Sequence, residues 1–380
     1  MSRKIRPVRL LYVINEVDYF LAHWMDRAAA AMQSGFDVHV AAPSAGRWTE
    51  IQTAGLTFHH IPLVRNRVNP LAEAITIRAL VLLYRRLSPQ IVHHVTIKPV
   101  IYGGLAARIA RMPGVVGTIP GLGTLFTSQE IRTKALRMIA RTGYRMALRN
   151  PATRVVFENG DDFQEFVALR IIDFAQGTVI KGAGVDTVRF QPEPEPEGPI
   201  RVVMAARLLW EKGVADFVEA ARLAHEANLP IRWVLAGDTD AGSPSAVPLT
   251  QLHAWHESGV VEWIGKQSDM PAVLTNAHIV CHPSRYREGV PRVLIEAASC
   301  GRPCVTTNAP GCRDIVRTGD NGILVPLGDP HAVYQAVAKL ARDPEMRIKM
   351  GNRGRQIVVS EFAKEIVIDA LLRIYGDMRR

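Results

Sequence analysis

The sequence predicts an α/β protein of two domains, each built on a parallel β-sheet covered by helices. Three observations lead to this prediction. A chain of 380 residues is longer than a single hydrophobic core usually supports. Short apolar runs alternate with helical stretches in two separate series, as they do in β-α-β units. A segment rich in proline and glutamate separates the two series.

The first domain is expected over residues 1–190. Basic residues precede its opening apolar run and resemble the start of a signal peptide. The run is too short for one, and Glu16 and Asp18 follow it, so we expect a first strand. No apolar run in the chain approaches the ~18–20 residues of a membrane-spanning helix. The alternating segments of this half are VRLLYVI (8–14), AHWMDRAAAAMQSG (22–35), DVHVAAP (37–43), FHHIPL (58–63), ALVLLYRRL (79–87), IVHHVT (91–96), YGGLAARIARM (102–112) and VVGTIP (115–120).

A linker is expected at residues 191–199, QPEPEPEGP, and the second domain at 200–361. The second series has the same rhythm as the first. Its apolar runs contain few polar positions, which is typical of strands buried on both faces of a parallel sheet. The expected strands are RVVMAA (201–206), IRWVLAG (231–237), VVEWIG (260–265), HIVCHPS (278–284), RPCVTT (302–307) and ILVP (323–326).

The positive charge is concentrated in the first half of the chain. Residues 1–190 hold 24 Lys and Arg against 13 Asp and Glu, whereas the remainder holds 22 against 23. Seven of these cations and no acid lie within residues 131–154, interleaved with apolar residues. Such a basic amphipathic helix can contact an anionic membrane, here through Arg137, Arg141 and Arg145. It can equally be a structural helix with its arginines in water, and both can hold. No nucleic-acid-binding motif accompanies the charge.

Two carboxylates stand eight positions apart in the segment SRYREGVPRVLIEAASCGRP, residues 284–303. Pro291 suits the first turn of a helix and Gly301 its end, so Glu288 is expected in a loop and Glu296 inside the helix. The amides of a helix N-terminus favour an anion such as a diphosphate. Carboxylates beside that anion would accept hydrogen bonds from hydroxyl groups. This combination predicts a ligand with phosphates and sugar hydroxyls. In the alternative interpretation, both glutamates are solvated surface residues.

Two cations follow the first expected strand of the second domain, in RVVMAARLLWEKG (201–213). Arg207 lies at the carboxyl end of the strand, and Lys212 lies in the turn before the next helix. Because ligands of open α/β sheets bind beyond the carboxyl ends of the strands, both are placed to neutralise a diphosphate. As isolated residues, an Arg and a Lys are more often surface charges.

Together these stretches resemble the donor site of the retaining glycosyltransferases of family 4, which have the GT-B fold. Glu288 and Glu296 match the family's two glutamates, and Arg207 and Lys212 match its Arg and Lys pair. The details resemble the branch that adds N-acetylhexosamine to undecaprenyl-diphosphate-linked sugars, and the likeness is weaker in the first 100 residues. Other segments that fit are TIPGLGTLF (118–126), VFENGDDFQEF (156–166), GAGVDTVRF (182–190), VLAGDTDAGSPSAVP (234–248), GVVEWIGKQSDMPAVLTNAHIVCHPS (259–284) and GCRDIVRTGDNGILVP (311–326).

The resemblance implies an architecture and a set of residue roles. Two Rossmann-like domains would face each other across a cleft. The first would bind the acceptor and the second the nucleotide sugar, with a final helix at about 362–380 packing back on the first. Arg207 and Lys212 would stabilise the departing UDP, Glu296 would bind ribose, and Glu288 would hold the donor sugar. The donor site would also include the backbone at Gly289, Val290 and Pro291. No metal or other cofactor is implied, and the configuration of the sugar would be retained.

Three features bear on this assignment. Asp238 and Asp240 resemble the metal-binding acids of a different glycosyltransferase fold; we expect a turn there instead, since Arg207 and Lys212 can supply the charge. The pair Cys300 and Cys304 lacks a partner pair at zinc-ligand spacing. The family's glycine-rich loop after the first strand is absent, the segment being NEVDYFLAH.

Candidates for the acceptor or cleft region come from the first domain. Gly121 and Gly123 form a weak glycine signal after a strand, without the rest of a dinucleotide fingerprint. Lys98 could meet an acceptor phosphate or be an ordinary solvated lysine. Many family members carry a donor-contacting histidine near Thr118, where this chain has none. His93 and His94 are expected to be structural.

The sequence therefore predicts a glycosyltransferase that moves a sugar from a UDP donor to a polyprenyl-diphosphate-linked saccharide in bacterial surface polysaccharide or glycan assembly. The enzyme would lie in the cytoplasm on the inner face of the plasma membrane. A nucleotide-sugar epimerase of the same fold and a non-catalytic lipid-surface binding protein are the alternatives. The donor epimer, the acceptor sugar, the linkage and the oligomeric state stay open.

Overall fold

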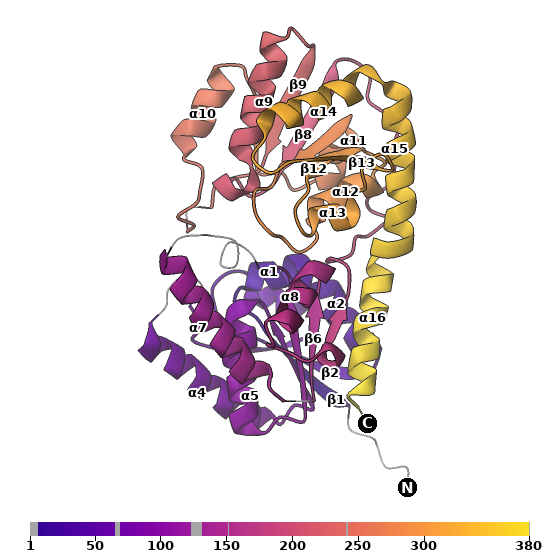
Figure 1. Ribbon diagram of the computed structural model, residues 1–380. Helices are drawn as coiled ribbons and strands as arrows, with labels where there is room; N and C mark the ends of the chain where they lie inside the picture. The colour runs from indigo at the N-terminus through magenta and orange to yellow at the C-terminus, as the bar shows by residue number, and fades with distance from the viewer. Residues whose placement is uncertain (1–6, 65–68, 123–130, 151, 241, 380) are drawn as a thin grey trace. The chain divides into compact units, whose positions relative to one another are not determined.

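The structure is a computed structural model with two compact units. Unit 1 comprises Met1–Ile180 and Val367–Arg380, and unit 2 comprises Lys181–Ile366. The structure describes residues 7–64, 69–122, 131–150, 152–240 and 242–379, and for 131–136 the backbone alone. Both units are α/β folds with parallel sheets, so the predicted fold class is confirmed (Figure 1).

Unit 1 contains a seven-stranded sheet in which all pairings are parallel, in the order β3-β2-β1-β4-β5-β6-β7. The order reverses direction between β1 and β4, as in doubly wound folds. Adjacent residues of a strand face opposite sides, so Leu10 and Leu11 belong to different cores. The strands are β1 (Val8–Val13), β2 (Phe36–Ala42), β3 (Thr57–His60), β4 (Ile91–Val95), β5 (Gly114–Ile119), β6 (Thr153–Phe157) and β7 (Gly177–Val179).

Helices cover both faces of this sheet. One face packs on α1, α2 and the C-terminal helix α16, through side chains such as Phe20, Ala28 and Leu371. The other face packs on α4, α5 and α7, through Leu80, Ala106 and further residues. The helices are α1 (Val17–His23), α2 (Met25–Gln33), α3 (Trp48–Thr53), α4 (Pro70–Leu87), α5 (Gly104–Ala110), α7 (Ile131–Leu148), α8 (Gly160–Ala168) and α16 (Lys364–Asp377).

Unit 2 contains a six-stranded parallel sheet in the order β10-β9-β8-β11-β12-β13. Its strands are β8 (Ile200–Ala205), β9 (Ile231–Ala236), β10 (Glu262–Gly265), β11 (Ile279–His282), β12 (Cys304–Thr307) and β13 (Gly322–Val325). Helices α9 and α14 share one core, and α12 belongs to the other. The helices are α9 (Val214–Glu226), α10 (Leu249–Glu257), α11 (Met270–Thr275), α12 (Arg292–Ser299), α13 (Cys312–Ile315), α14 (Pro330–Arg342) and α15 (Pro344–Ile357).

The chain enters unit 2 at Lys181, ten residues before the domain boundary expected from the sequence. The expected linker, residues 191–199, belongs to unit 2. The physical reason is packing: the buried residues Val185 and Phe190 join the same core as Phe362. Within the linker segment, Glu195 forms an ion pair of 2.8 Å with Arg347. The segment rich in proline and glutamate is therefore an ordered, non-helical part of unit 2. The chain passes from unit 1 to unit 2 before this segment, at residue 181.

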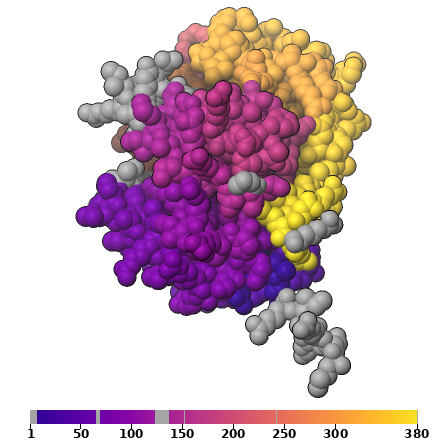
Figure 2. Space-filling view, turned by 60° about the horizontal axis from the view of Figure 1, so that its bottom comes forward, coloured from indigo at the N-terminus to yellow at the C-terminus, as the bar shows by residue number. Residues whose placement is uncertain are grey.

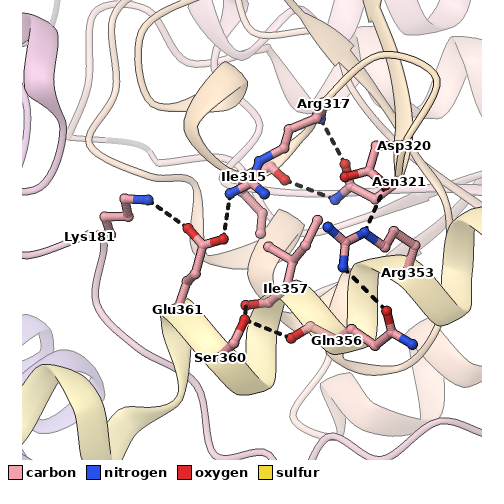
Figure 3. A network of polar contacts seen from close by, with 10 residues as sticks. All are labelled: Lys181, Ile315, Arg317, Asp320, Asn321, Arg353, Gln356, Ile357, Ser360 and Glu361. Carbon is pink, nitrogen blue, oxygen red and sulfur yellow. Dashed lines mark hydrogen bonds and ion pairs between the residues drawn. The ribbon is translucent and has the colours of Figure 1, made fainter.

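Polar contacts fasten the first residues of unit 2 to its last ones (Figure 3). Glu361 accepts from Lys181 and from Arg317, each at 2.6 Å. The backbone amide of Val185 donates to the carbonyl of Phe362, and the amide of Lys364 donates back to Val185, both at 2.9 Å. These bonds hold together the two segments that leave and re-enter unit 1.

The final helix returns to unit 1, which contains residues from Val367 onward. Tyr375 of this helix is buried, and its hydroxyl contacts Tyr12 of β1 and His93 of β4. None of the helices within the described ranges is long and apolar enough to span a membrane.

Candidate functional site in unit 2

The predicted donor residues lie at the carboxyl ends of two adjacent strands, β8 and β11. Two glycines with positive φ allow their loops to approach closely. A β-carbon at Gly213 would overlap the carbonyl oxygen of Pro283, which brings the loop after β8 against the loop after β11. A β-carbon at Gly311 would overlap the carbonyl oxygen of Gly289. Only glycine avoids both the overlap and the backbone strain at these two positions.

Lys212 and Glu288 form a largely buried ion pair across the two loops. The ammonium of Lys212 donates to Oε2 of Glu288, and the side chains are 12% and 9% exposed. His282, the last residue of β11, lies 2.9 Å from Oε1 of Glu288 through Nε2. Because an ionised carboxylate only accepts hydrogen bonds, Nε2 of His282 carries the proton in this arrangement. Both carboxylate oxygens are thus fixed in orientation.

The electrostatic balance keeps both members of this pair charged. Burial alone would raise the pKa of Glu288, but the charge of Lys212 and the hydrogen bond from His282 outweigh it and hold the pKa well below its ordinary value. Burial alone would lower the pKa of Lys212, but Glu288 outweighs it and raises the pKa. The Lys212 ammonium also lies 5.1 Å from the ring centre of Tyr286. Both side chains are therefore charged at neutral pH, and each holds the other in place.

Arg207 lies two residues beyond the end of β8 and is more exposed than Lys212. Its guanidinium forms an ion pair of 2.9 Å with Asp240, and about half of its side chain, 53%, is exposed. The charges of Arg207 and Lys212 both act on Tyr286, whose pKa is raised by burial and lowered in part by these two cations. Arg207 and Lys212 therefore both lie near Tyr286.

The loop-to-helix prediction for the two glutamates is confirmed. Pro291 immediately precedes α12, Glu288 lies in the loop, and Glu296 lies in the helix. Both glutamates are buried, at 9% and 6% exposure, so the alternative of a solvated pair is wrong. Arg292 binds Glu296 at 2.7 Å one turn away. Burial raises the pKa of Glu296, and Arg292 offsets this only in part.

The remaining residues of the predicted donor site belong to the same loop. Gly289 contacts Gly311 through its backbone, as described above. Val290 is buried, at 4% exposure, and packs in the core of unit 2. Asp238, the other acid of the possible metal pair, accepts the amide of Thr239 at 2.8 Å in its own turn. With Asp240 bound to Arg207, the two acids take part in local contacts of the chain.

The acceptor candidates lie in unit 1. Lys98 forms an ion pair of 2.8 Å with Glu73 and donates to the carbonyl of Val64 at 2.6 Å. Lys98 is therefore not a solvated loop lysine, and a phosphate would have to compete with Glu73. Gly121 follows β5 in a loop, and Gly123 lies outside the described residues.

The two histidines of β4 are buried, as expected for structural residues. His93 contacts Thr118 at 2.7 Å and Tyr375 at 2.5 Å. His94 contacts the hydroxyl of Tyr84 at 2.9 Å. Thr118, near which many family members carry the donor-contacting histidine, is thus bound within the core of unit 1.

Two of the arginines proposed to contact a membrane have structural roles in unit 1. Arg141 donates to the carbonyl of Leu169 at 3.1 Å, and Arg145 donates to Leu169 at 2.6 Å and to Arg170 at 3.1 Å. These carbonyls lie at the end of α8, where cations satisfy free acceptors and the helix dipole. Arg137, the third, is half-buried.

The sequence analysis missed two members of the site. His282 holds Glu288, and Tyr286 packs beside Lys212. The signal was present in CHPSRYRE, since His282 ends an apolar strand six residues before Glu288. Polar residues at the carboxyl end of a buried strand are positioned for a site.

Matches to models of known families cover most of the chain. Residues 186–357 match the family model described as Glycosyl transferases group 1, and residues 9–159 match the model described as Glycosyl transferase 4-like. The first match contains Arg207, Lys212, Glu288 and Glu296. The two matches correspond to unit 2 and unit 1 in turn.

Individual relatives and structures agree with these matches. The chain is 26% identical over 354 residues, 89% of this chain and 90% of the relative, to an N,N'-diacetylbacillosaminyl-diphospho-undecaprenol alpha-1,3-N-acetylgalactosaminyltransferase of Campylobacter jejuni. It is 24% identical, over 90% of this chain and 89% of the relative, to a UDP-Gal:alpha-D-GlcNAc-diphosphoundecaprenol alpha-1,3-galactosyltransferase of Escherichia coli. The structure of Anabaena HepE in complex with UDP and glucose superposes with a TM-score of 0.77 at 18% identity, over 97% of this chain and 99% of that one.

Proposed function

The chain belongs to the family 4 glycosyltransferases with the GT-B fold, and from this premise we propose that it transfers a sugar from a UDP donor to a polyprenyl-diphosphate-linked saccharide. The sugar is N-acetylhexosamine, and the product enters bacterial surface polysaccharide or glycan assembly. Two relatives whose names specify undecaprenyl-diphosphate-linked sugars, each covering about nine-tenths of both chains, support this choice of acceptor.

The observation that carries the proposal is the convergence of Arg207 and Lys212 beside Tyr286 at the carboxyl end of β8. When the donor bond breaks, negative charge grows on the departing UDP. Fixed cations in a partly dry site stabilise that charge without reorganising, which is usually the largest catalytic contribution. Lys212 is suited to this role because its pair with Glu288 keeps it charged and in place.

The two glutamates bind different parts of the donor. Glu288 lies beside Lys212, and both of its carboxylate oxygens are fixed by hydrogen bonds. Its remaining lone pairs accept a hydrogen bond from a hydroxyl of the donor sugar. Glu296 lies on α12, where Arg292 binds it at 2.7 Å, and it accepts hydrogen bonds from the ribose hydroxyls. The sugar keeps its anomeric configuration, with attack on the face that UDP leaves and the leaving phosphate taking the acceptor proton.

The reaction proceeds without a metal ion. Arg207 and Lys212 supply the charge that Mg²⁺ or Mn²⁺ supplies at other diphosphate sites. The pairing of Asp240 with Arg207 supports this reading, because that carboxylate is already neutralised by a cation of the chain. Activity is expected to survive EDTA, and full loss in EDTA restored by Mn²⁺ would favour the Asp238 and Asp240 metal site instead.

The enzyme works at the inner face of the plasma membrane, where the lipid-linked acceptor is held. Unit 1 supplies the membrane contact, because the excess of positive charge resides in residues 1–190. Anionic lipids attract such clusters of cations.

The test is incubation of the protein with labelled UDP-sugars, with and without a bacterial lipid extract. Transfer requires lipid and yields a labelled product that partitions into organic solvent. A nucleotide-sugar epimerase would convert the donor without lipid, and a non-catalytic scaffold would do neither. Either of these two outcomes would overturn the proposal.

A further inference from the structure

Helices α4, α5 and α7 of unit 1 lie next to one another (Figure 1). All three expose large apolar side chains to solvent. Leu71 is 77% exposed, and Met138 and Ile139 are each 69% exposed. These helices pack side by side on one face of the sheet. The seven exposed apolar residues are Leu71, Ile75 and Leu82 of α4, Ile109 of α5, and Met138, Ile139 and Met146 of α7. We call these seven residues, with the exposed arginines among them, the three-helix face.

The outward side of α4 is a regular row along the helix. Leu71, Ile75, Arg78, Leu82 and Arg85 follow one another at intervals of four, three, four and three residues and are all exposed. This spacing places them on one side of a helix. The opposite side packs in the core of unit 1. A helix that is apolar on both sides is normally covered on both, so something other than water is expected over this row.

The stretch of sequence that contains most of these three helices is almost wholly positive in its charges. Between residues 74 and 157 the chain has thirteen Lys and Arg but a single acid, Glu130. Glu73, which precedes this stretch, is paired with Lys98. Arg78 and Arg85 of α4 are exposed, as are Arg111 and Arg149, which directly follow α5 and α7. Residues of α4 and α5, in the purple colour range, form a continuous part of the surface in Figure 2.

We propose that the three-helix face is the surface by which unit 1 binds an anionic lipid bilayer. The apolar side chains enter the boundary of the acyl chains, and the surrounding arginines bind the phosphates of the lipids. A second copy of the chain is a poor occupant, because it would bring the same positive charges against them. The inference deepens the proposed function by assigning its membrane partner to particular residues.

The proposal changes which arginines make the contact. Arg141 and Arg145 donate to the carbonyls after α8, and their guanidinium groups are committed to unit 1. Arg78 and Arg85 stand in the exposed row of α4, a helix that the charge pattern of residues 131–154 does not include. The membrane contact therefore extends from α7 across to α4.

The test is co-sedimentation with vesicles, using the purified full chain without any sugar donor. One variant combines Leu71→Gln, Ile75→Gln and Leu82→Gln, and a second combines Arg78→Gln with Arg85→Gln. On vesicles of phosphatidylglycerol mixed with phosphatidylcholine, the apolar variant should partition roughly tenfold more weakly or worse. The arginine variant should lose about 25-fold, since each cation near the surface contributes roughly fivefold. Wild type should bind pure phosphatidylcholine weakly and should be released by salt.

Matched controls come from exposed residues of unit 2. Leu249→Gln with Leu327→Gln and Ile348→Gln removes as many exposed apolar side chains, and Arg342→Gln with Lys349→Gln removes as many cations. These controls should sediment like wild type. Thermal unfolding and UDP affinity in calorimetry should be unchanged in all four variants, which separates this inference from the proposed reaction.

Two outcomes would overturn the inference. One is sedimentation of both α4 variants at the wild-type level, or equal losses in the unit 2 controls. The other is a wild-type dimer in analytical ultracentrifugation that the α4 variants convert to monomer, because the face would then be a protein interface.

Discussion

The two units have the same doubly wound architecture but differ in how many acids accompany the cations of particular regions. In unit 2 the cations of the candidate site are matched by acids: Lys212 by Glu288, Arg207 by Asp240 and Arg292 by Glu296. In unit 1, thirteen cations face a single acid between residues 74 and 157. Some of them bind main-chain carbonyls, and others lie exposed on helices.

The difference shows what each region requires from its surroundings. A matched pair such as Lys212 and Glu288 is fixed in place before a ligand arrives, which suits a site that stabilises a transition state. Unmatched arginines on helix surfaces need a counter-charge from outside the chain, which suits adhesion to an extended anionic surface. The fold is shared, and the function of each unit depends on where the carboxylates are.

The largest expected effect comes from breaking the matched pair. Lys212→Met should lower kcat by about 10²–10³-fold, because a preorganised charge at the leaving group is lost. It should also cost unit 2 about 3–5 kcal/mol of stability, because Glu288 is left buried without its partner. Turnover with labelled UDP-sugar and urea unfolding measure the two losses.

The double variant Lys212→Met with Glu288→Gln is the matching control. Removing both charges should restore most of the stability while leaving the enzyme inactive. Activity in the double variant would contradict the assignment of Lys212 to the leaving diphosphate.

In unit 1, the sharpest contrast is between two arginines of one region, Arg145 and Arg149. Arg145→Ala should destabilise unit 1 by about 1.5–3 kcal/mol, because the carbonyls of Leu169 and Arg170 lose a charged donor. The exposed Arg149 should tolerate the same change within about 0.5 kcal/mol. Urea unfolding followed by circular dichroism measures both. Equal stability of the two variants would show that Arg145 is not structural.

Within unit 2, substitutions of the two buried glutamates should have different effects. Glu296→Ala should weaken UDP binding by about tenfold, since hydrogen bonds to a charged group are lost. Glu288→Gln should leave UDP affinity nearly intact and lower turnover, because Glu288 is assigned to the sugar. Glutamine is chosen at 288 because alanine would leave Lys212 buried and unpaired. Calorimetry with UDP decides, and unchanged affinity in Glu296→Ala would refute its ribose contact.

The smallest effect is the pH dependence of stability, and the same glutamates should differ in its sign. The pKa of Glu288 is depressed, so its contribution to stability is present above the ordinary value near 4.5 and is lost as the pH falls. The pKa of Glu296 is raised, so its contribution is complete below that value and is lost as the pH rises through the folded-state pKa.

The measurement is Tm against pH for wild type, Glu288→Gln and Glu296→Gln. Relative to wild type, Glu288→Gln should lose stability as the pH rises toward about 4.5 and change little above it, whereas Glu296→Gln should gain stability as the pH rises above about 4.5. Each difference should amount to about 2–4 °C in Tm or less, the shift that ~1 kcal/mol produces in a domain of this size. Parallel curves for the two variants would contradict the opposite environments of these carboxylates.

The sequence by itself determined the parallel sheets and the positions of the donor residues. Strand-length apolar runs fix where strands end, and in a parallel sheet the carboxyl ends share one edge. Arg207 and Lys212 were therefore placed on that edge from the sequence, with Glu288 in a loop and Glu296 in the helix that follows it. The helix between Pro291 and Gly301 was predictable because proline and glycine act through their own backbone.

Only the tertiary structure decided which partners these residues have. The sequence does not predict that Lys212 pairs with Glu288 or that His282 binds the same carboxylate. It also does not predict that Arg145 binds a carbonyl at the end of α8. The crossing at residue 180 depends on Val185 packing in a core whose other members are distant in the chain. Periodicity identifies the faces of a helix, as on α4, but which face a neighbour covers depends on long-range packing. Local chemistry thus set the elements and their ends, and non-local contacts set the pairings, the boundary between the units and the exposed face.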